Sequence, residues 1–312
     1  MKRGIKQGDS LSPLLFIIFM DAILKKCRSR IPKVKVGNWK LSPTYISNLA
    51  FADDLVTMAD TPSKLQTALN IWQQELTNHG MEMNIAKTKI MHIRGNKEER
   101  TQERITIKDQ EVEWVDYYDY LGVRISETGK IDEEILNRTR KGSQVYYQLN
   151  QCLINKKEVS IDAKMRIYNA IYVPTLLYGL ESAVLQEKHK KSIQASEMKF
   201  LRRAIGKTKK DRVRNTKIRK DVDQTPLNDI LEQKQLKWYG HLVRMDENRI
   251  VKKIFQCKEE GKRRRGRPRT SFEQHIEQLG RKRGKTKKEM EKLAMNRKEY
   301  GKWTEAPTLN TA

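Results

Sequence analysis

The chain has 312 residues, with 64 Lys and Arg against 39 Asp and Glu, so its formal net charge is +25. This length fits one large domain or two, and a hydrophobic content of 37 % argues against wholesale disorder. Residues 1–200 carry a net charge of +7 and residues 201–312 carry +18. We therefore expect a folded body followed by a basic region that binds a polyanion, whether nucleic acid, an acidic protein or a membrane surface.

Cysteine usage and hydropathy restrict the cellular setting. Cys27, Cys152 and Cys257 lie far apart, and an odd, sparse set predicts no disulfide partner and a reducing compartment, nuclear or cytoplasmic. The sequence contains no CxxC pair and no Cys/His cluster, so we expect no zinc site. No apolar run approaches the ~20 residues that span a bilayer, so we expect no membrane partner.

The first predicted element is a helix. Ser12 as N-cap and Pro13 at the first helical position predict its start. The run to Leu24 is apolar on nearly every face, which predicts a buried helix. Two strands follow, roughly Ser47–Ala52 and Leu55–Ala59, with a pair of aspartates at the turn between them.

Further along, Thr61-Pro62 starts a second helix, which Gly80 should terminate. Short strands are then predicted over Lys87–Ile93, Ile105–Ile107, Val112–Val115 and Tyr120–Ile125. The first ~125 residues therefore read as mixed α and β.

After Gly129 the pattern becomes helical. The predicted helices are Asp132–Leu153, Asp162–Leu185, His189–Ile205 and Pro226–Met245. Pro174 should kink or break the second of these. Gly261–Thr270 reads as a basic loop, 281–298 as a charged, solvated helix, and Pro307–Ala312 as a frayed end.

Four segments carry residues suited to chemistry. Asp53-Asp54, between two apolar strands, fits either a polar turn or a site for a hard cation such as Mg²⁺. A Gly-rich segment, Arg3–Phe16, leads into the first helix and would let a phosphate approach, unless it is only a loop and cap. Gly80–Lys89 carries Lys87, either a phosphate partner or a solvated charge. In Tyr120–Val123, Gly122 suggests a close backbone approach.

Taken in this order, the four segments resemble the reverse transcriptase domain of non-LTR (LINE-type) retrotransposons. Arg3–Phe16 resembles the family's GxxQGxxLSPxLF block, and Phe51–Asp54 resembles its [YF]ADD box. Gly80–Lys89 resembles the block that follows, and Tyr120–Val123 resembles the YLG block. Group II intron reverse transcriptases share the first two blocks and remain an alternative.

The resemblance implies an α+β fold: a partial reverse transcriptase palm of antiparallel strands with helices over 1–128, an all-helical thumb over 129–206, and a basic nucleic-acid-binding region over 207–312. The implied activity is RNA-directed DNA synthesis with an RNA template, a DNA primer or target, and dNTP. The family also uses a third carboxylate upstream of its QG block. This sequence does not contain it, so we expect a truncated fragment that is inactive alone.

The resemblance also implies roles for individual residues. Asp53 and Asp54 would be the catalytic metal ligands for Mg²⁺. Gln7, Gly8 and Lys87 would lie at the template and nucleotide, and Tyr120, Leu121 and Gly122 would form the primer grip.

The basic loop supports an alternative function, that of a non-catalytic nucleic-acid-binding protein. Its arginines are Arg263, Arg264, Arg265, Arg267 and Arg269. The Arg-Gly-Arg-Pro core resembles an AT-hook, whose arginines enter narrow minor grooves. The same run fits a nuclear localisation signal or a solvated linker. Nearby, Trp238 and Tyr239 fit base stacking or, more often at this helical spacing, a core.

Overall fold

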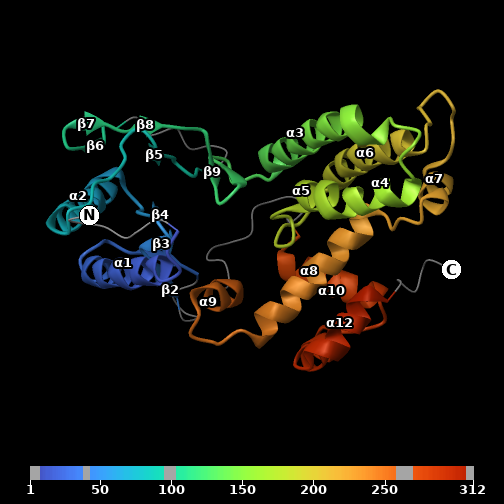
Figure 1. Cartoon of the computed structure of the whole chain (residues 1–312). Coiled ribbons are helices and arrows are strands. Elements are labelled where there is room, and N and C mark those ends of the chain that lie inside the picture. The colour runs from blue at the N-terminus through green and yellow to red at the C-terminus, as the bar shows by residue number, and fades with distance from the viewer. Residues whose placement is uncertain (1–7, 38–42, 95–102, 258–269, 307–312) are drawn as a thin grey trace. The chain divides into compact units, whose positions relative to one another are not determined.

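The computed structural model describes residues 8–37, 43–94, 103–257 and 270–306, and it combines helices with short strands. The chain divides into two compact units (Figure 1). The first comprises Met1–Tyr118 with Asn248–Lys262, and the second comprises Asp119–Glu247 with Arg263–Ala312. None of the described helices is long and apolar enough to cross a membrane.

Two helices form the main core of the first unit. These are α1 (Ser12–Arg28) and α2 (Pro62–Asn78). As predicted, α2 begins after Thr61, whose hydroxyl accepts a hydrogen bond from the Lys64 N–H at 3.3 Å. The apolar stripe of α2 packs on the C-terminal half of α1, and the buried residues are Met20, Ile23, Cys27, Ile31, Ala68, Trp72 and Leu76.

The expectation that α1 is buried on nearly every face is wrong. Only one stripe packs inward, because residues 20, 23 and 27 repeat at the helical spacing and face α2. Phe16 and Leu24 are partly buried beside this stripe. Six apolar side chains at and after the N-cap are 38–59 % exposed; they are Leu11, Leu14, Leu15, Ile17, Ile18 and Phe19. Ser12 is also not the N-cap: the helix already includes it, and the Asp9 carboxylate accepts the Leu11 N–H at 2.8 Å instead.

The remaining elements of the first unit are short. Strands β1 (Val34–Val36) and β2 (Thr44–Ile46) form an antiparallel pair, as do β6 (Thr106–Ile107) and β7 (Gln110–Glu111). Strands β5 (Lys89–Ile90) and β8 (Glu113–Trp114) pair in parallel. Four residues from this region, Ile90, Ile105, Ile107 and Val112, pack with Leu69 of α2. A short helix, α9 (Ile250–Gln256), completes the unit.

From Asp132 on, the second unit is helical, as predicted, but two predicted helices include π-helical turns. The first runs as α3 (Asp132–Leu149) into η2 (Asn150–Ile154). The second runs as α4 (Ile161–Ile167), η3 (Tyr168–Tyr172) and α5 (Val173–Leu177). Pro174 lies in the first turn of α5 and cannot donate a backbone hydrogen bond, which accounts for the irregular turn just before it. Helix α5 itself ends at Leu177.

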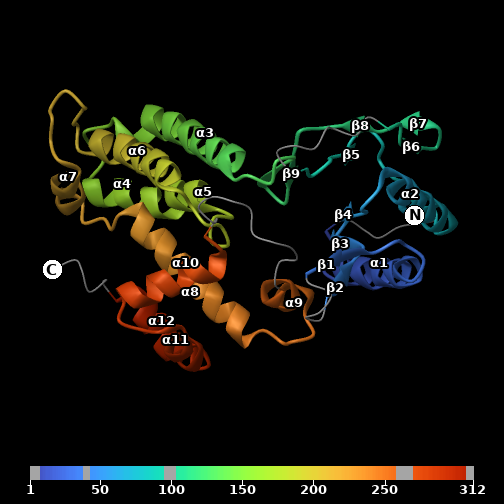
Figure 2. The ribbon, with the colours of Figure 1, turned by 180° about the vertical axis from the view of Figure 1, so that it is seen from behind.

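Helices α6 (Glu187–Ala204), α7 (Asn215–Asp221) and α8 (Leu227–Arg244) complete the core of this part. Helices α3 and α6 lie side by side in both views (Figures 1 and 2). The aromatic rings of Tyr168, Tyr172 and Phe200 pack together within the hydrophobic core of the second unit. A buried ion pair joins α6 to α7, where Arg219 reaches Glu197 at 2.7 Å.

The C-terminal helices are α10 (Phe272–Lys282), α11 (Lys287–Ala294) and α12 (Arg297–Glu305). The prediction of one solvated helix over 281–298 is wrong. The Thr286–Glu289 capping box starts a new helix there, and α11 and α12 pack on α8. Tyr239 is 1 % exposed, which confirms its core assignment over base stacking.

Candidate functional site

The two candidate catalytic aspartates lie at the tip of a β-hairpin in the first unit. Strand β3 (Asn48–Phe51) pairs with β4 (Asp54–Thr57), and Phe51 is directly opposite Asp54. Ala52 and Asp53 therefore make the two-residue turn. Asp54 begins the second strand, one residue earlier than predicted, so the two carboxylates leave the backbone from a turn and from a strand end.

The turn contains backbone strain. Ala52 has φ +52°, in the left-handed region. This conformation costs a non-glycine residue about 1–2 kcal/mol and is enriched at functional sites, where the surrounding structure maintains it. Both carboxylates are exposed. A short hairpin of fixed register therefore presents two acidic groups to the solvent.

The donor chemistry at this tip suits a hard cation. Carboxylate oxygens are the preferred ligands of Mg²⁺, which commonly uses one or two carboxylates and completes its octahedron with waters and substrate phosphates. Within the described ranges, no cluster of three or more His, Cys, Asp or Glu side chains could hold a metal. Asp53 and Asp54 thus fit an open, partial coordination sphere and not a closed protein cage.

The Gly-rich block is partly visible. Gln7 lies outside the described residues. Gly8 is exposed with φ +86°, and a Cβ built on it would have nothing within 4 Å. The glycine is required there by backbone conformation, because side-chain-bearing residues rarely adopt this φ.

Lys87 lies in a turn that precedes β5. The predicted strand Lys87–Ile93 is shorter in the structure, because Asn84 folds the chain back first. Its Oδ1 accepts the Lys87 N–H at 3.1 Å, and its carbonyl oxygen accepts the Thr88 N–H at 2.9 Å. This turn fixes the backbone and leaves the Lys87 side chain exposed.

The segment predicted as one strand, Tyr120–Ile125, is instead a hairpin. Strand β9 (Tyr117–Tyr120) turns through Leu121 and Gly122 into β10 (Val123–Ser126). Leu121 has φ +48° and Gly122 has φ +79°, the two positive values that a tight hairpin turn requires. The expected close approach at Gly122 is present, since a Cβ there would lie 3.4 Å from the Tyr178 ring.

A hydrogen-bonded network, anchored by one buried ion pair, fixes this turn against the helices of the second unit. Tyr178 donates its hydroxyl to the Leu121 carbonyl oxygen at 2.9 Å, and Arg138 donates to the Gly122 carbonyl oxygen. The Arg138 guanidinium lies 5.2 Å from the centroid of the Tyr178 ring. It also pairs with Glu134 at 2.6 Å, with both side chains less than 5 % exposed.

Comparisons with known proteins identify the family. Residues 1–125 match the family described as reverse transcriptase (RNA-dependent DNA polymerase). The chain is 35 % identical over 141 residues to a Pol polyprotein of the retrotransposable element R2 from Nasonia vitripennis, which covers 43 % of this chain and 13 % of that protein. It is 22 % identical over 253 residues to the RNA-directed DNA polymerase of the mobile element jockey from Drosophila melanogaster. That match covers 80 % of this chain and 27 % of the jockey protein. The chain therefore contains a reverse transcriptase segment over residues 1–125 that is similar to those of non-LTR retrotransposons.

The length of the match differs among relatives. An uncharacterized transposon-derived protein of Caenorhabditis elegans is 26 % identical over 211 residues, covering 65 % of this chain and 74 % of that protein. The chain spans less than a third of the R2 and jockey proteins named above. The matched reverse transcriptase segment contains the Asp53–Asp54 hairpin, Lys87 and the Leu121–Gly122 turn.

The structure distributes the predicted site residues over two units. Gly8, the Asp53–Asp54 hairpin and Lys87 belong to separate segments of the first unit, whereas the Leu121–Gly122 turn belongs to the second. The basic-loop arginines lie outside the described residues; they are Arg263, Arg264, Arg265, Arg267 and Arg269.

Sequence reasoning missed the residues that fix the turn. Glu134 and Arg138 are four residues apart on a predicted helix, a spacing that favours an ion pair and was available in the sequence. Tyr178 is 57 residues from Leu121, and no local pattern indicates their contact.

Proposed function

We propose that this chain provides part of the active centre of an RNA-directed DNA polymerase, with an RNA template, a DNA primer or target and dNTP as partners. The observation that supports this most is the strained Asp53–Asp54 hairpin within the segment matching the reverse transcriptase family. In this proposal, 1–128 are palm, 129–206 are thumb and 207–312 are a basic nucleic-acid-binding region.

Each predicted residue then has a chemical task. Asp53 and Asp54 hold Mg²⁺, which when bound neutralises charge on the reacting phosphates. Lys87 presents its exposed ammonium group to the triphosphate, and Gly8 lets the nucleotide approach the backbone. The Leu121–Gly122 turn supports the primer end. The three free thiols fit a reducing nuclear or cytoplasmic setting.

The test is a chimera in which residues 1–125 replace the corresponding segment of the jockey polymerase. Mg²⁺-dependent primer extension is measured on an RNA template. Asp54→Asn should lower the rate by about a hundredfold or more, because a metal contributes several kcal/mol of charge stabilisation.

Asp109→Asn is the matched control. Asp109 is also an exposed hairpin-turn aspartate, with φ +66° between β6 and β7, and its substitution should leave the rate unchanged. An Asp54→Asn chimera as active as the unsubstituted chimera would refute the metal-binding role.

The second candidate function is nucleic-acid binding without catalysis. The net charge of +18 over residues 201–312 favours it. Replacing the basic-loop arginines 263, 264, 265, 267 and 269 by Gln in the full chain should make duplex DNA binding less salt-dependent, since each lost phosphate contact removes about 0.9 from the logarithmic slope. An unchanged slope would exclude these arginines from the interface.

A further inference from the structure

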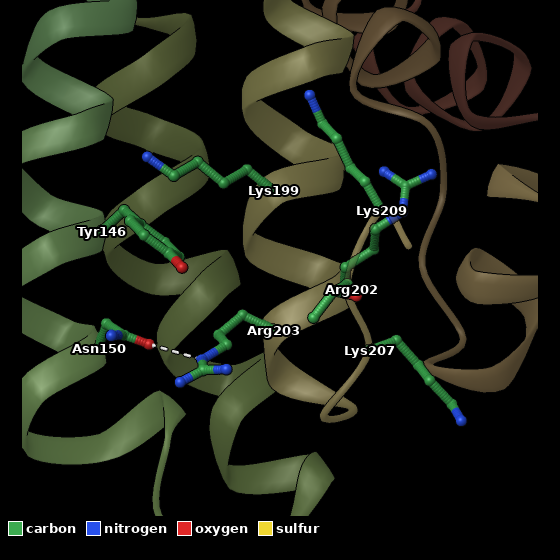
Figure 3. A pocket seen from close by; sticks show the side chains of 8 residues that line it. Tyr146, Asn150, Lys199, Arg202, Arg203, Lys207 and Lys209 are labelled. Carbon is green, nitrogen blue, oxygen red and sulfur yellow. Dashed lines mark hydrogen bonds between the residues drawn. The ribbon is translucent and has the colours of Figure 1, made fainter. Parts of the chain in front are cut away.

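A basic pocket lies in the second unit, between the end of α3 with η2 and the end of α6 with the segment after it (Figure 3). Its volume is about 300 Å³. The lining residues are Tyr146, Asn150, Lys199, Arg202, Arg203, Lys207, Thr208 and Lys209. Helix α6 contributes three of them, and the segment that follows contributes three more.

Five of these eight residues are cationic, and none of the eight, all in the described part of the chain, is acidic. The carboxylate of Asp211 is directed to the adjacent turn, where it accepts the Thr208 N–H at 2.6 Å and the Thr208 hydroxyl at 2.8 Å. These hydrogen bonds lower the pKa of Asp211, so it holds the turn as an anion. Positive charges gathered around one cavity repel one another, and a bound anion would relieve that repulsion.

Several of the cations are already held in place. Arg203 reaches from α6 to Asn150 and donates to its Oδ1 at 3.3 Å (Figure 3). Lys199 donates to the Tyr147 hydroxyl at 3.1 Å, with its ammonium 4.5 Å from the centroid of the Tyr146 ring. Side chains held in this way lose less conformational entropy when a ligand binds.

An aromatic residue beside the pocket indicates the class of anion. Tyr147 is 58 % exposed, and the Lys199 ammonium lies 4.2 Å from its ring centroid. Cations that follow a sugar–phosphate backbone, next to an exposed aromatic ring on which a base can stack, are the combination used to bind single-stranded nucleic acid. An acidic peptide would use the cations but would have no base to place on the ring.

We propose that this pocket binds the phosphate backbone of a single-stranded nucleic acid segment, with Tyr147 contacting a base. The proposal rests on the proposed function for its class of partner and adds a binding site on α3 and α6. It requires neither the Asp53–Asp54 hairpin nor the basic loop.

The test measures binding of a labelled single-stranded oligonucleotide to the full chain by fluorescence anisotropy, without Mg²⁺, over a series of salt concentrations. The pocket variant is Lys199→Gln/Arg203→Gln/Lys207→Gln. Its logarithmic salt slope should fall by about 2, and binding at physiological salt should weaken about tenfold or more, since each single-strand phosphate contact contributes about 0.7 to the slope.

A charge-matched control removes three exposed lysines of the same unit that do not line the pocket and that lie outside 207–312: Lys130→Gln/Lys157→Gln/Lys191→Gln. The logarithmic salt slope of this control should change by less than half of the change seen in the pocket variant. A second variant, Lys207→Gln/Lys209→Gln, alters only exposed residues after α6, so it tests the pocket without disturbing a helix. Equal losses in the pocket and control variants would overturn the proposal.

Three further measurements define the ligand. Tyr147→Ala should weaken binding about fivefold or more if a base stacks there, and an unchanged affinity would overturn the assignment to single strands. In a competition experiment, polyglutamate and free dNTP should displace the labelled oligonucleotide less effectively than the unlabelled strand does. Equal displacement by either competitor would also overturn the assignment to single strands. Because this assay measures binding without Mg²⁺ or DNA synthesis, its failure is distinguishable from failure of the polymerase proposal, which primer extension by the chimera tests.

Discussion

The network that fixes the Leu121–Gly122 turn makes a quantitative prediction for Arg138→Met. Arg138 pairs with Glu134 at 2.6 Å, and because Nε and Oε1 lack hydrogen-bond alignment the attraction between these two atoms is Coulombic. The substitution leaves Glu134, 3 % exposed, as a buried carboxylate without its counter-charge. Removing one partner of a buried pair costs about 3–5 kcal/mol, so we expect the free energy of unfolding to fall by that amount.

Glu134→Gln should cost less. The amide oxygen can still accept the Arg124 N–H, which Glu134 accepts at 2.7 Å, so about 1–3 kcal/mol is expected. The double variant Glu134→Gln/Arg138→Met should be less destabilised than the sum of the two single variants, because it leaves neither charge buried alone.

Urea unfolding followed by far-UV circular dichroism measures these free energies. Tyr178→Phe is the control: it removes one hydrogen bond from a 51 % exposed side chain and should cost at most about 1.5 kcal/mol. An Arg138→Met cost below about 1 kcal/mol, or strict additivity in the double variant, would refute the reasoning that the pair is buried and coupled.

Three other predictions concern packing, pH and thiol reactivity. Gly240→Ala should lower the free energy of unfolding by about 1–3 kcal/mol, because the new methyl group would lie 2.4 Å from a ring carbon of Tyr300. Gly301→Ala places its methyl group in open space and should raise the free energy of unfolding by about 0.5–1 kcal/mol. Thermal unfolding of the two variants measures both changes. Burial, followed by the charge of a nearby lysine, lowers the pKa of His275 from 6.5, so the unfolded state takes up the proton first. Stability should therefore fall as pH drops below about 6.5, and His275→Gln should reduce that fall in urea titrations at successive pH values. Burial, followed by a nearby glutamate, raises the pKa of Cys27 to about 11, so iodoacetamide should modify the exposed Cys152 first, as peptide mass mapping would show.

Elements set by local chemistry were predictable. Thr61 and Pro62 begin α2 as expected, because capping and a fixed proline φ act within one turn of the chain. Pro174 interrupts its helix for the same kind of local reason. The helical character of the second unit follows from apolar periodicity in the same way.

What depended on distant contacts was not predictable. The burial of α1 is decided by which neighbours it has, and its composition alone suggested a fully covered helix. The Leu121–Gly122 turn was read as a strand because its stabilising partner, Tyr178, is distant in sequence. For the candidate site, the motif located Asp53 and Asp54 at a hairpin, whereas the strained φ of Ala52 required coordinates.

The exposed apolar row on α1 has a practical consequence for handling the protein. At low salt, the net charge of +25 keeps molecules apart and opposes association through those side chains. Salt shortens the range of this repulsion to about 3 Å at 1 M. The high-salt wash that strips nucleic acid from a basic protein is therefore the step at which α1 faces of different molecules should begin to adhere.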